Sequence, residues 1–286
     1  MCTNIFYKYR LKEFSAPFNL RVFCGTWNVC NKVCGDDNLL KDWLFPKGQS
    51  QYADIYAIAL QEIVDLNARN VVIDGSKSDE KSGYWNLQLY NIIVETTGKP
   101  YTMLIERHLV GVSLAIFVKE VHASQVSDYR GATLGIGLMG VMGNKGAVSI
   151  RMNIFDTSVC FVSCHLRAHK EEVLGRNIDA KQILERTNFL PVIDSIYQAN
   201  IPLKASNSWR TDEFYSAFGI EQHDYVFILG DLNYRIANMP TLGVFGLLET
   251  DAWRNLLSND QLNIERARGA VFSDFQVESY TCFLIF

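Results

Sequence analysis

The sequence AVSIRMNIFDTSVCFVSCHL, residues 147–166, contains the clearest pair of strands in the chain. Two runs rich in β-branched, aromatic and other apolar residues lie on either side of Asp156 and Thr157, which read as a turn. We therefore predict a β-hairpin, with one strand at Ala147–Phe155 and the other at Ser158–Leu166.

Short apolar runs of the same kind recur on both sides of this hairpin, and each ends in polar residues. Their length, their β-branched and aromatic content and their turn-like boundaries predict strands. These strands are Leu20–Asn28, Asp54–Glu62, Val110–Lys119 and Asp224–Asn233. Strand-forming segments are therefore spread over most of the chain.

Helical segments are expected between these strands. Ser82–Thr96 is one candidate, and Lys170–Ser195 is a stronger one that Pro191 should interrupt. The polar, irregular stretch Gln198–Gln222 is expected to lie on the surface. Strands and helices mixed in this way favour an α/β sandwich, in which two packed sheets are flanked by helices.

The composition fits a soluble globular protein with a large core, because 48% of the 286 residues are hydrophobic and 20% are charged. The net charge of −4 argues against a broad nucleic-acid surface, although a few local cations can still bind an anionic substrate. The seven cysteines form no CxxC pair, which fits the reduced thiols of a cytoplasmic protein. We expect neither a secretory signal nor a transmembrane segment.

Predicted strands end in polar side chains at Asn28, Glu62, His165 and the pair Asp231 and Asn233. Rigid strand ends are places where binding sites are often built. Residues two apart on a strand share a face, so Asp231 and Asn233 would face one point. There a carboxylate can orient or deprotonate water, and an amide can donate to a phosphate oxygen. The alternative is an ordinary turn, where Asp and Asn are common.

Glu62 closes an otherwise apolar strand and suits a hard cation such as Mg²⁺, which takes one or two protein carboxylates. The alternative is an exposed glutamate on a loop. His165 is either a donor to phosphate or a half-buried histidine with a satisfied hydrogen bond. Cys164 precedes it, but neighbours on a strand face opposite sides, and no second Cys/His cluster completes a zinc site.

The segment Gly137–Ile150 is rich in glycine around Asn144 and Lys145. It lacks the Gly-Lys-Ser/Thr of a P-loop, but backbone amides beside a lysine can still bind an anion. The alternative is a flexible turn before the next strand. Taken together, these patterns predict a cation, a phosphate and an activated water at the rim of a sheet.

Six segments resemble, in order and spacing, successive signatures of the inositol polyphosphate 5-phosphatases, with most similarity to the lipid-acting, synaptojanin-like branch. They are FCGTWNV (Phe23–Val29), LQEIVDLNA (Leu60–Ala68), RHLVGVSLAIFVK (Arg107–Lys119), GVMGNKGAVSIR (Gly140–Arg151), FVSCHLRAH (Phe161–His169) and GDLNYRI (Gly230–Ile236). The resemblance implies a lead-in at residues 1–19, a catalytic domain at 20–275 and a divergent tail at 276–286. It also implies the four-layer α/β sandwich of DNase I-like nucleases, with two packed mixed β-sheets flanked by helices.

The resemblance implies a role for each residue at the strand ends. Glu62 would be the principal Mg²⁺ ligand, with Asn28 beside it as a second one. Asp231 would orient the attacking water, while Asn233 and His165 would hold the scissile phosphate. Water would then attack the phosphate in line, without a covalent enzyme intermediate.

The same resemblance implies the substrate and its surroundings. The substrate would be a phosphoinositide such as phosphatidylinositol 4,5-bisphosphate, or an inositol phosphate, that loses its 5-phosphate. Asn144 and Lys145 would contact a second inositol phosphate, and Arg235 would support the anionic cleft. A cytoplasmic protein with peripheral membrane contact is expected.

The sequence also departs from the family. Members continue past an FSDF-like segment to a further Asp and a Ser-Asp-His motif, whereas QVESYTCFLIF follows Phe275 here. We therefore expect a catalytic domain incomplete at its C-terminus, with weak or no activity. Arg167 stands where the family more often has alanine, which adds a cation near the site.

Two alternatives to an active phosphatase remain at this point. One is a pseudophosphatase that binds phosphoinositide without turnover. The other is a nuclease of the same fold class, against which the acidic net charge and the GNKGAV segment argue.

Overall fold

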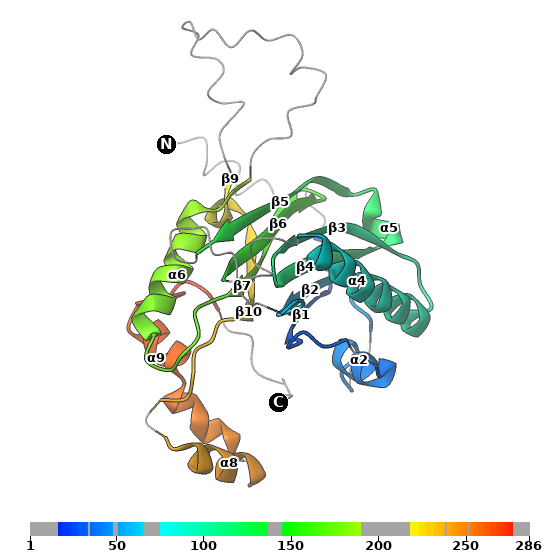
Figure 1. The fold of residues 1–286 in the computed structure, drawn as a ribbon. Coiled ribbons are helices and arrows are strands. Elements are labelled where there is room, and N and C mark those ends of the chain that lie inside the picture. The colour runs from blue at the N-terminus through cyan, green and yellow to red at the C-terminus, as the bar shows by residue number, and fades with distance from the viewer. Residues whose placement is uncertain are drawn as a thin grey trace, which may run out of the picture.

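The computed structural model describes residues 17–33, 35–47, 51–65, 75–136, 145–189, 218–237, 239–250 and 252–276. Two four-stranded sheets pack face to face, and helices cover their outer faces (Figure 1). This arrangement confirms the predicted four-layer α/β sandwich.

The first sheet has the strand order β1-β2-β4-β3. β1 (Val22–Asn28) pairs parallel with β2 (Ile55–Gln61), which pairs antiparallel with β4 (Val112–Lys119). β3 (Tyr101–Leu109) lies antiparallel to β4 at the edge. Because β2 and β4 are central and covered on both faces, their sequences are almost continuously apolar.

The second sheet has the strand order β10-β7-β6-β5. β10 (Tyr225–Asp231) pairs parallel with β7 (Thr157–His165), which pairs antiparallel with β6 (Gly146–Ile154). β5 (Val126–Gly135) pairs antiparallel with β6 at the other edge. The predicted hairpin is thus confirmed as β6 and β7, with its turn at residues 155 and 156.

Four strands were not predicted from the sequence, namely the short pair β8 (Asn188–Phe189) and β9 (Phe218–Gly219) described below and the longer edge strands β3 and β5. The two edge strands show why. In both, most residues are only partly buried, and charged or polar side chains interrupt the apolar pattern. An edge strand with one face open to solvent carries a weaker apolar signal than a central strand.

Helices α2 (Asp37–Leu44) and α4 (Gly75–Thr97) pack on the first sheet, and α6 (Val173–Arg186) packs on the second (Figure 1). The smaller elements are α5 (Glu120–Ala123), β8 (Asn188–Phe189), β9 (Phe218–Gly219), η2 (Ile220–Gln222), α8 (Thr241–Glu249), η3 (Trp253–Asn259) and α9 (Gln261–Ala267). No helix in the described part of the chain is long and apolar enough to cross a membrane.

The prediction that a helix runs to Ser195 was wrong, because α6 ends at Arg186. The chain turns extended at Thr187, and β8 then pairs with β9, which buries Phe189 against the second sheet. The neighbouring stretch 198–222 was expected on the surface. Residues 198–217 lie outside the described part, but Ile220 is fully buried, so the prediction was wrong at that end.

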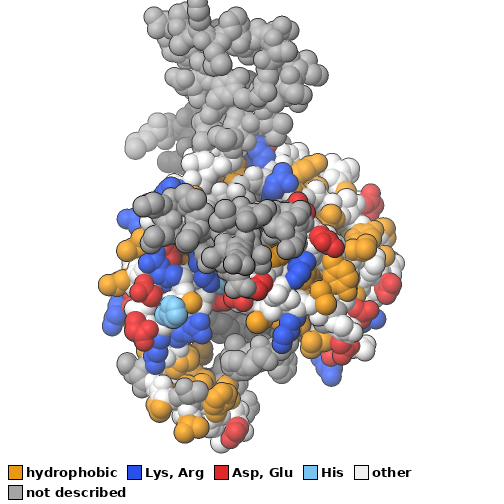
Figure 2. Space-filling model, viewed as in Figure 1, with side chains coloured by type: hydrophobic (Ala, Val, Ile, Leu, Met, Phe, Trp, Pro, Cys, Tyr) orange, Lys and Arg blue, Asp and Glu red, His pale blue; other side chains and the backbone are white. Residues whose placement is uncertain are grey.

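The alternating side chains of β2 connect two layers of the core. Ile55, Ala57 and Ala59 face the second sheet and help to fill the space between the sheets. Tyr56 and Ile58 face the other way and pack under α2 and α4. A third layer lies between the second sheet and α6. On the visible face, basic and acidic side chains are interspersed (Figure 2).

Candidate active site

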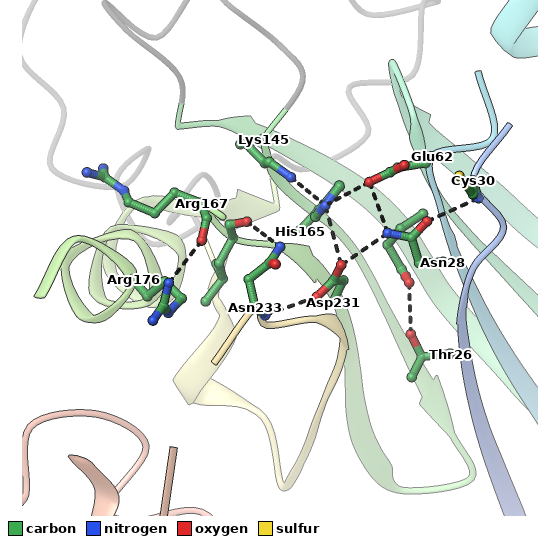
Figure 3. Close-up of polar contacts among 12 residues, drawn as sticks. Thr26, Asn28, Cys30, Glu62, Lys145, His165, Arg167, Arg176, Asp231 and Asn233 are labelled. Carbon is green, nitrogen blue, oxygen red and sulfur yellow. Dashed lines mark hydrogen bonds and ion pairs between the residues drawn. The ribbon is translucent and has the colours of Figure 1, made fainter. Parts of the chain in front are cut away.

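The two parallel strand pairs bring their carboxyl ends to the same edge of the sandwich. Asn28 ends β1 and Glu62 directly follows β2, while His165 and Asp231 are register partners at the ends of β7 and β10. The Asn28 Nδ2 donates to Glu62 Oε1 at 3.0 Å and to Asp231 Oδ2 at 3.1 Å (Figure 3). One amide therefore joins carboxylates from two different sheets.

Asp231 is held on both of its carboxylate oxygens. Oδ2 accepts from Asn28, and Oδ1 accepts from the backbone N–H of Asn233 at 3.0 Å. The His165 Nε2 lies 3.6 Å from Asp231 Oδ2 and 3.8 Å from Glu62 Oε1, which is close but beyond hydrogen-bond length. The carboxylate is thus fixed in orientation before any ligand is bound.

Two of the predicted site residues adopt left-handed backbone conformations. Glu62 has φ = 55° and Asn233 has φ = 57°. Asparagine tolerates this region comparatively well, whereas glutamate is rarely found there. Local strain of this kind clusters at functional sites, and here it turns both side chains at the ends of their strands.

The only cation in contact with His165 among the described residues is Lys145, which precedes β6. Its ammonium group contacts the His165 Nε2. Burial, together with the charge of Lys145, lowers the pKa of His165 to about 4, so the imidazole is neutral at pH 7. Burial also lowers the pKa of Lys145, while Asp231 and Glu62 oppose that shift. A neutral imidazole can accept a hydrogen bond from the ammonium group.

The oxygen atoms of the site suit a hard divalent cation. Glu62 and Asp231 supply two negative charges, and the ammonium group of Lys145 supplies one positive charge. The Glu62 side chain is 33% exposed, so an ion can reach it from solvent. Its Oε2 forms no hydrogen bond with any residue that the structure describes. Within the described ranges no three His, Cys, Asp or Glu side chains are arranged to hold a metal. Mg²⁺ needs no such cluster, because it usually keeps waters and substrate phosphate as ligands.

The Asn28 side chain turns its amide nitrogen toward the site, whereas a metal ligand would present its oxygen. Its Oδ1 accepts from the Cys30 backbone N–H at 3.1 Å, so the nitrogen faces the carboxylates. Ligation of a cation by Asn28 therefore requires the amide to turn over.

The remaining predicted residues follow β10 or precede β6. Asn233 is buried, donates through Nδ2 to Leu166 O at 3.0 Å and accepts from Arg235 Nη2 at 2.5 Å. Arg235 is thus placed beside Asn233, and Lys145 beside His165. Asn144 lies outside the described residues.

Arg167, expected as an additional cation near the site, is held by Asp179 of α6. Its Nη2 donates to Asp179 Oδ1 at 2.6 Å and its Nε to Oδ2 at 2.8 Å. A two-pronged pair of this kind fixes geometry as well as charge. Arg167 therefore ties the segment after β7 to α6.

The sequence did not reveal a buried hydrogen-bond network that joins the segments following β7 and β10, next to the candidate site. The fully buried Arg176 donates to His169 O at 2.6 Å and to Gln261 Oε1 at 2.7 Å. Gln261 also accepts from the Arg235 backbone N–H and donates to Lys170 O, each at 2.9 Å. These contacts join the segments that follow β7 and β10. In the sequence, the only signal was an arginine on the apolar side of a helix.

Gln261→Ala is expected to destabilise the fold by about 1–3 kcal/mol, because it leaves buried donors and a carbonyl without partners. The free energy of unfolding in urea measures this effect. Gln125→Ala is the control, since Gln125 is exposed, and it should change stability by less than about 0.5 kcal/mol. Equal stability of the two variants would contradict the supporting role of the network.

Residues 25–283 match the model of a protein family described as Endonuclease/Exonuclease/phosphatase family 2. The chain belongs to this family. Human synaptojanin-1 is 34% identical over 291 residues, which cover 96% of this chain and 16% of synaptojanin-1. Mouse type II inositol 1,4,5-trisphosphate 5-phosphatase is 33% identical over 259 residues, covering 90% of this chain and 23% of that protein. The resemblance to inositol polyphosphate 5-phosphatases is therefore confirmed.

A solved structure agrees with this assignment. The inositol polyphosphate 5-phosphatase domain of SPsynaptojanin, in complex with inositol (1,4)-bisphosphate and calcium ion, matches with a TM-score of 0.73 and 30% identity. The match covers 94% of this chain and 68% of that one. A Cimex nitrophorin, at 14% identity and a TM-score of 0.58, shares the fold alone. The family fold therefore does not by itself determine the chemistry, and the argument for function depends on the site.

Proposed function

We propose that this chain hydrolyses the 5-phosphate of phosphoinositides such as phosphatidylinositol 4,5-bisphosphate, using Mg²⁺. The observation that supports the proposal most is the meeting of Glu62 and Asp231, from two sheets, on the amide of Asn28. The names of the relatives, inositol polyphosphate 5-phosphatases, support the substrate class.

In this proposal Glu62 is the principal Mg²⁺ ligand, and Asn28 becomes the second one once its amide turns. When bound, the ion would polarise the phosphate and stabilise the charge that develops on its oxygens. The Asn28 amide keeps the two carboxylates at a fixed spacing until then. Such preorganisation limits the rearrangement needed when substrate enters.

Asp231 would orient the attacking water. The Asn233 N–H still holds Oδ1 of Asp231 after the Asn28 amide has turned, so the carboxylate keeps a defined direction. Asn233, just after β10, and His165, at the end of β7, belong to the same sheet as Asp231 and would hold the scissile phosphate. His165 is neutral, so it can hydrogen-bond there without adding charge.

Lys145 and Arg235 would bind the other phosphates of the inositol ring, with Asn144 as a further contact. Both cations lie at the same edge as the carboxylates, where they favour an anionic substrate. We propose a cytoplasmic protein that contacts membranes peripherally, because the lipid substrate lies there.

The test is release of phosphate from soluble inositol 1,4,5-trisphosphate and from phosphatidylinositol 4,5-bisphosphate in micelles. We expect release that a chelator abolishes and added Mg²⁺ restores. If the folded chain releases no phosphate at micromolar concentration, the proposed activity is rejected. The alternative, a pseudophosphatase, then predicts headgroup binding that is lost in Lys145→Ala.

A further inference from the structure

Helix α8 is apolar, yet the fold leaves it largely uncovered. No charged residue occurs from Ile236 to Leu248. None of the described side chains of α8 is buried, and Leu242 and Phe245 are 85% and 52% exposed. Leu242 is the most exposed large hydrophobic side chain in the described part of the chain. A helix that is apolar on all sides is normally buried in a core or in a membrane.

Hydrogen bonds join the two ends of the segment that carries α8. Ile236 forms an antiparallel bridge with Asp260, and the Ala237 N–H donates to Asn259 O at 2.6 Å. The Gln261 N–H donates to Arg235 O at 3.0 Å. Between these anchors α8 packs against η3 and projects beyond the sandwich (Figure 1). These contacts hold the exposed helix in a defined position relative to the sandwich.

The hydrogen-bonded base of the α8 segment lies directly after β10, the strand that ends at Asp231. β10 runs toward Asp231 and Asn233, and its chain continues through Arg235 into the base of the segment. Figure 1 shows α8 beyond the end of β10, and Figure 2 shows hydrophobic side chains at the same end of the molecule. The apolar helix thus projects from the edge at which the candidate active site opens.

We propose that α8 inserts into the outer part of a lipid bilayer and so rests the active-site edge on the membrane surface. Leu242 and Phe245 are three residues apart and lie on one face of the helix, next to the exposed Gly246. The role of α8 rests on the proposed function, because insertion would bring the site to a substrate that is anchored in lipid.

The chemistry of the exposed face selects a bilayer over a protein partner. Protein interfaces have a polar rim and roughly one hydrogen bond per 100–200 Å². After Thr241, its first residue, α8 contains only Leu, Val, Phe and Gly up to Glu249. Lipid acyl chains need no polar groups, and apolar side chains insert among them. Because the run is uncharged, its binding should depend little on salt or on anionic lipid.

The experiment measures co-flotation with vesicles of pure phosphatidylcholine. The full chain should bind equally at low and high salt. The double variant Leu242→Glu/Phe245→Glu should bind at least about tenfold more weakly. Val121→Glu is the matched control, because Val121 is 68% exposed on α5, which follows β4 at the opposite edge of the sandwich. This control should bind like the unmodified chain.

Unchanged flotation of the double variant, or equal loss in Val121→Glu, overturns the proposal. So does a dimer in solution that the double variant dissociates while vesicle binding persists, since α8 would then join two copies. Phosphate release from soluble inositol trisphosphate should be the same in the double variant and the unmodified chain, and lower for the variant on vesicles. Absence of soluble hydrolysis in the unmodified chain would reject the proposed function, while flotation would still decide the role of α8.

Discussion

Glu62→Gln is expected to lower Mg²⁺-dependent phosphate release by about a thousandfold, while the protein stays folded. The amide has nearly the shape of the carboxylate, and its oxygen can still accept from Asn28. It lacks the negative charge that a hard cation requires. Comparison of kcat/KM between the variant and the unmodified chain measures the loss as transition-state stabilisation.

Glu172→Gln is the matched control for this loss. Glu172 is a glutamate that is 49% exposed and lies beside Arg167, outside the cluster around Asn28. Its neutralisation removes one charge but no proposed ligand, so activity should change little. If both variants retained full activity, Glu62 would not be the metal ligand.

Gly230→Ala is expected to unfold the edge that carries the candidate active site, with a loss of about 3 kcal/mol or more in stability and loss of activity. Gly230 has φ = 120°, and an added Cβ would lie 2.0 Å from the carbonyl oxygen of Cys164. The two residues are register partners, one position before Asp231 and His165. The methyl group must therefore push β10 away from β7 where the site is built.

Gly83→Ala provides the contrast, because the methyl group there meets nothing within 4 Å apart from its own stretch of helix backbone. Gly83 lies within α4, where alanine is the better helix former by about 1 kcal/mol. Urea unfolding of the two variants should move in opposite directions. If Gly230→Ala were as stable as the unmodified chain, the close approach of β10 and β7 would be wrong.

The central strands could be predicted because they are buried on both faces. β2 and β7 have nearly unbroken apolar sequences, so their polar last residues, or those just after them, stand out. Because parallel strands end at the same edge, polar residues far apart in the sequence converge there. Their positions at the ends of predicted strands were enough to group Glu62, His165 and Asp231 into one candidate site.

Other features could not be predicted, since they depend on contacts between segments. β3 and β5 have an open face and a mixed pattern. Arg176 and Gln261 are buried only because the chain after β7 and the start of α9 meet around them. The amide of Asn28 is oriented by the Cys30 N–H, a contact that strand periodicity does not encode.

The most direct test of the account is calorimetric titration of Mg²⁺ into the unmodified chain, Glu62→Gln and Asp231→Asn. In the proposed mechanism Glu62 binds one divalent ion, and the nearby carboxylate of Asp231 on the other sheet attracts the ion through its charge. We therefore expect one ion bound per chain and markedly weaker binding in both variants. Binding by both variants with the affinity of the unmodified chain would contradict this mechanism.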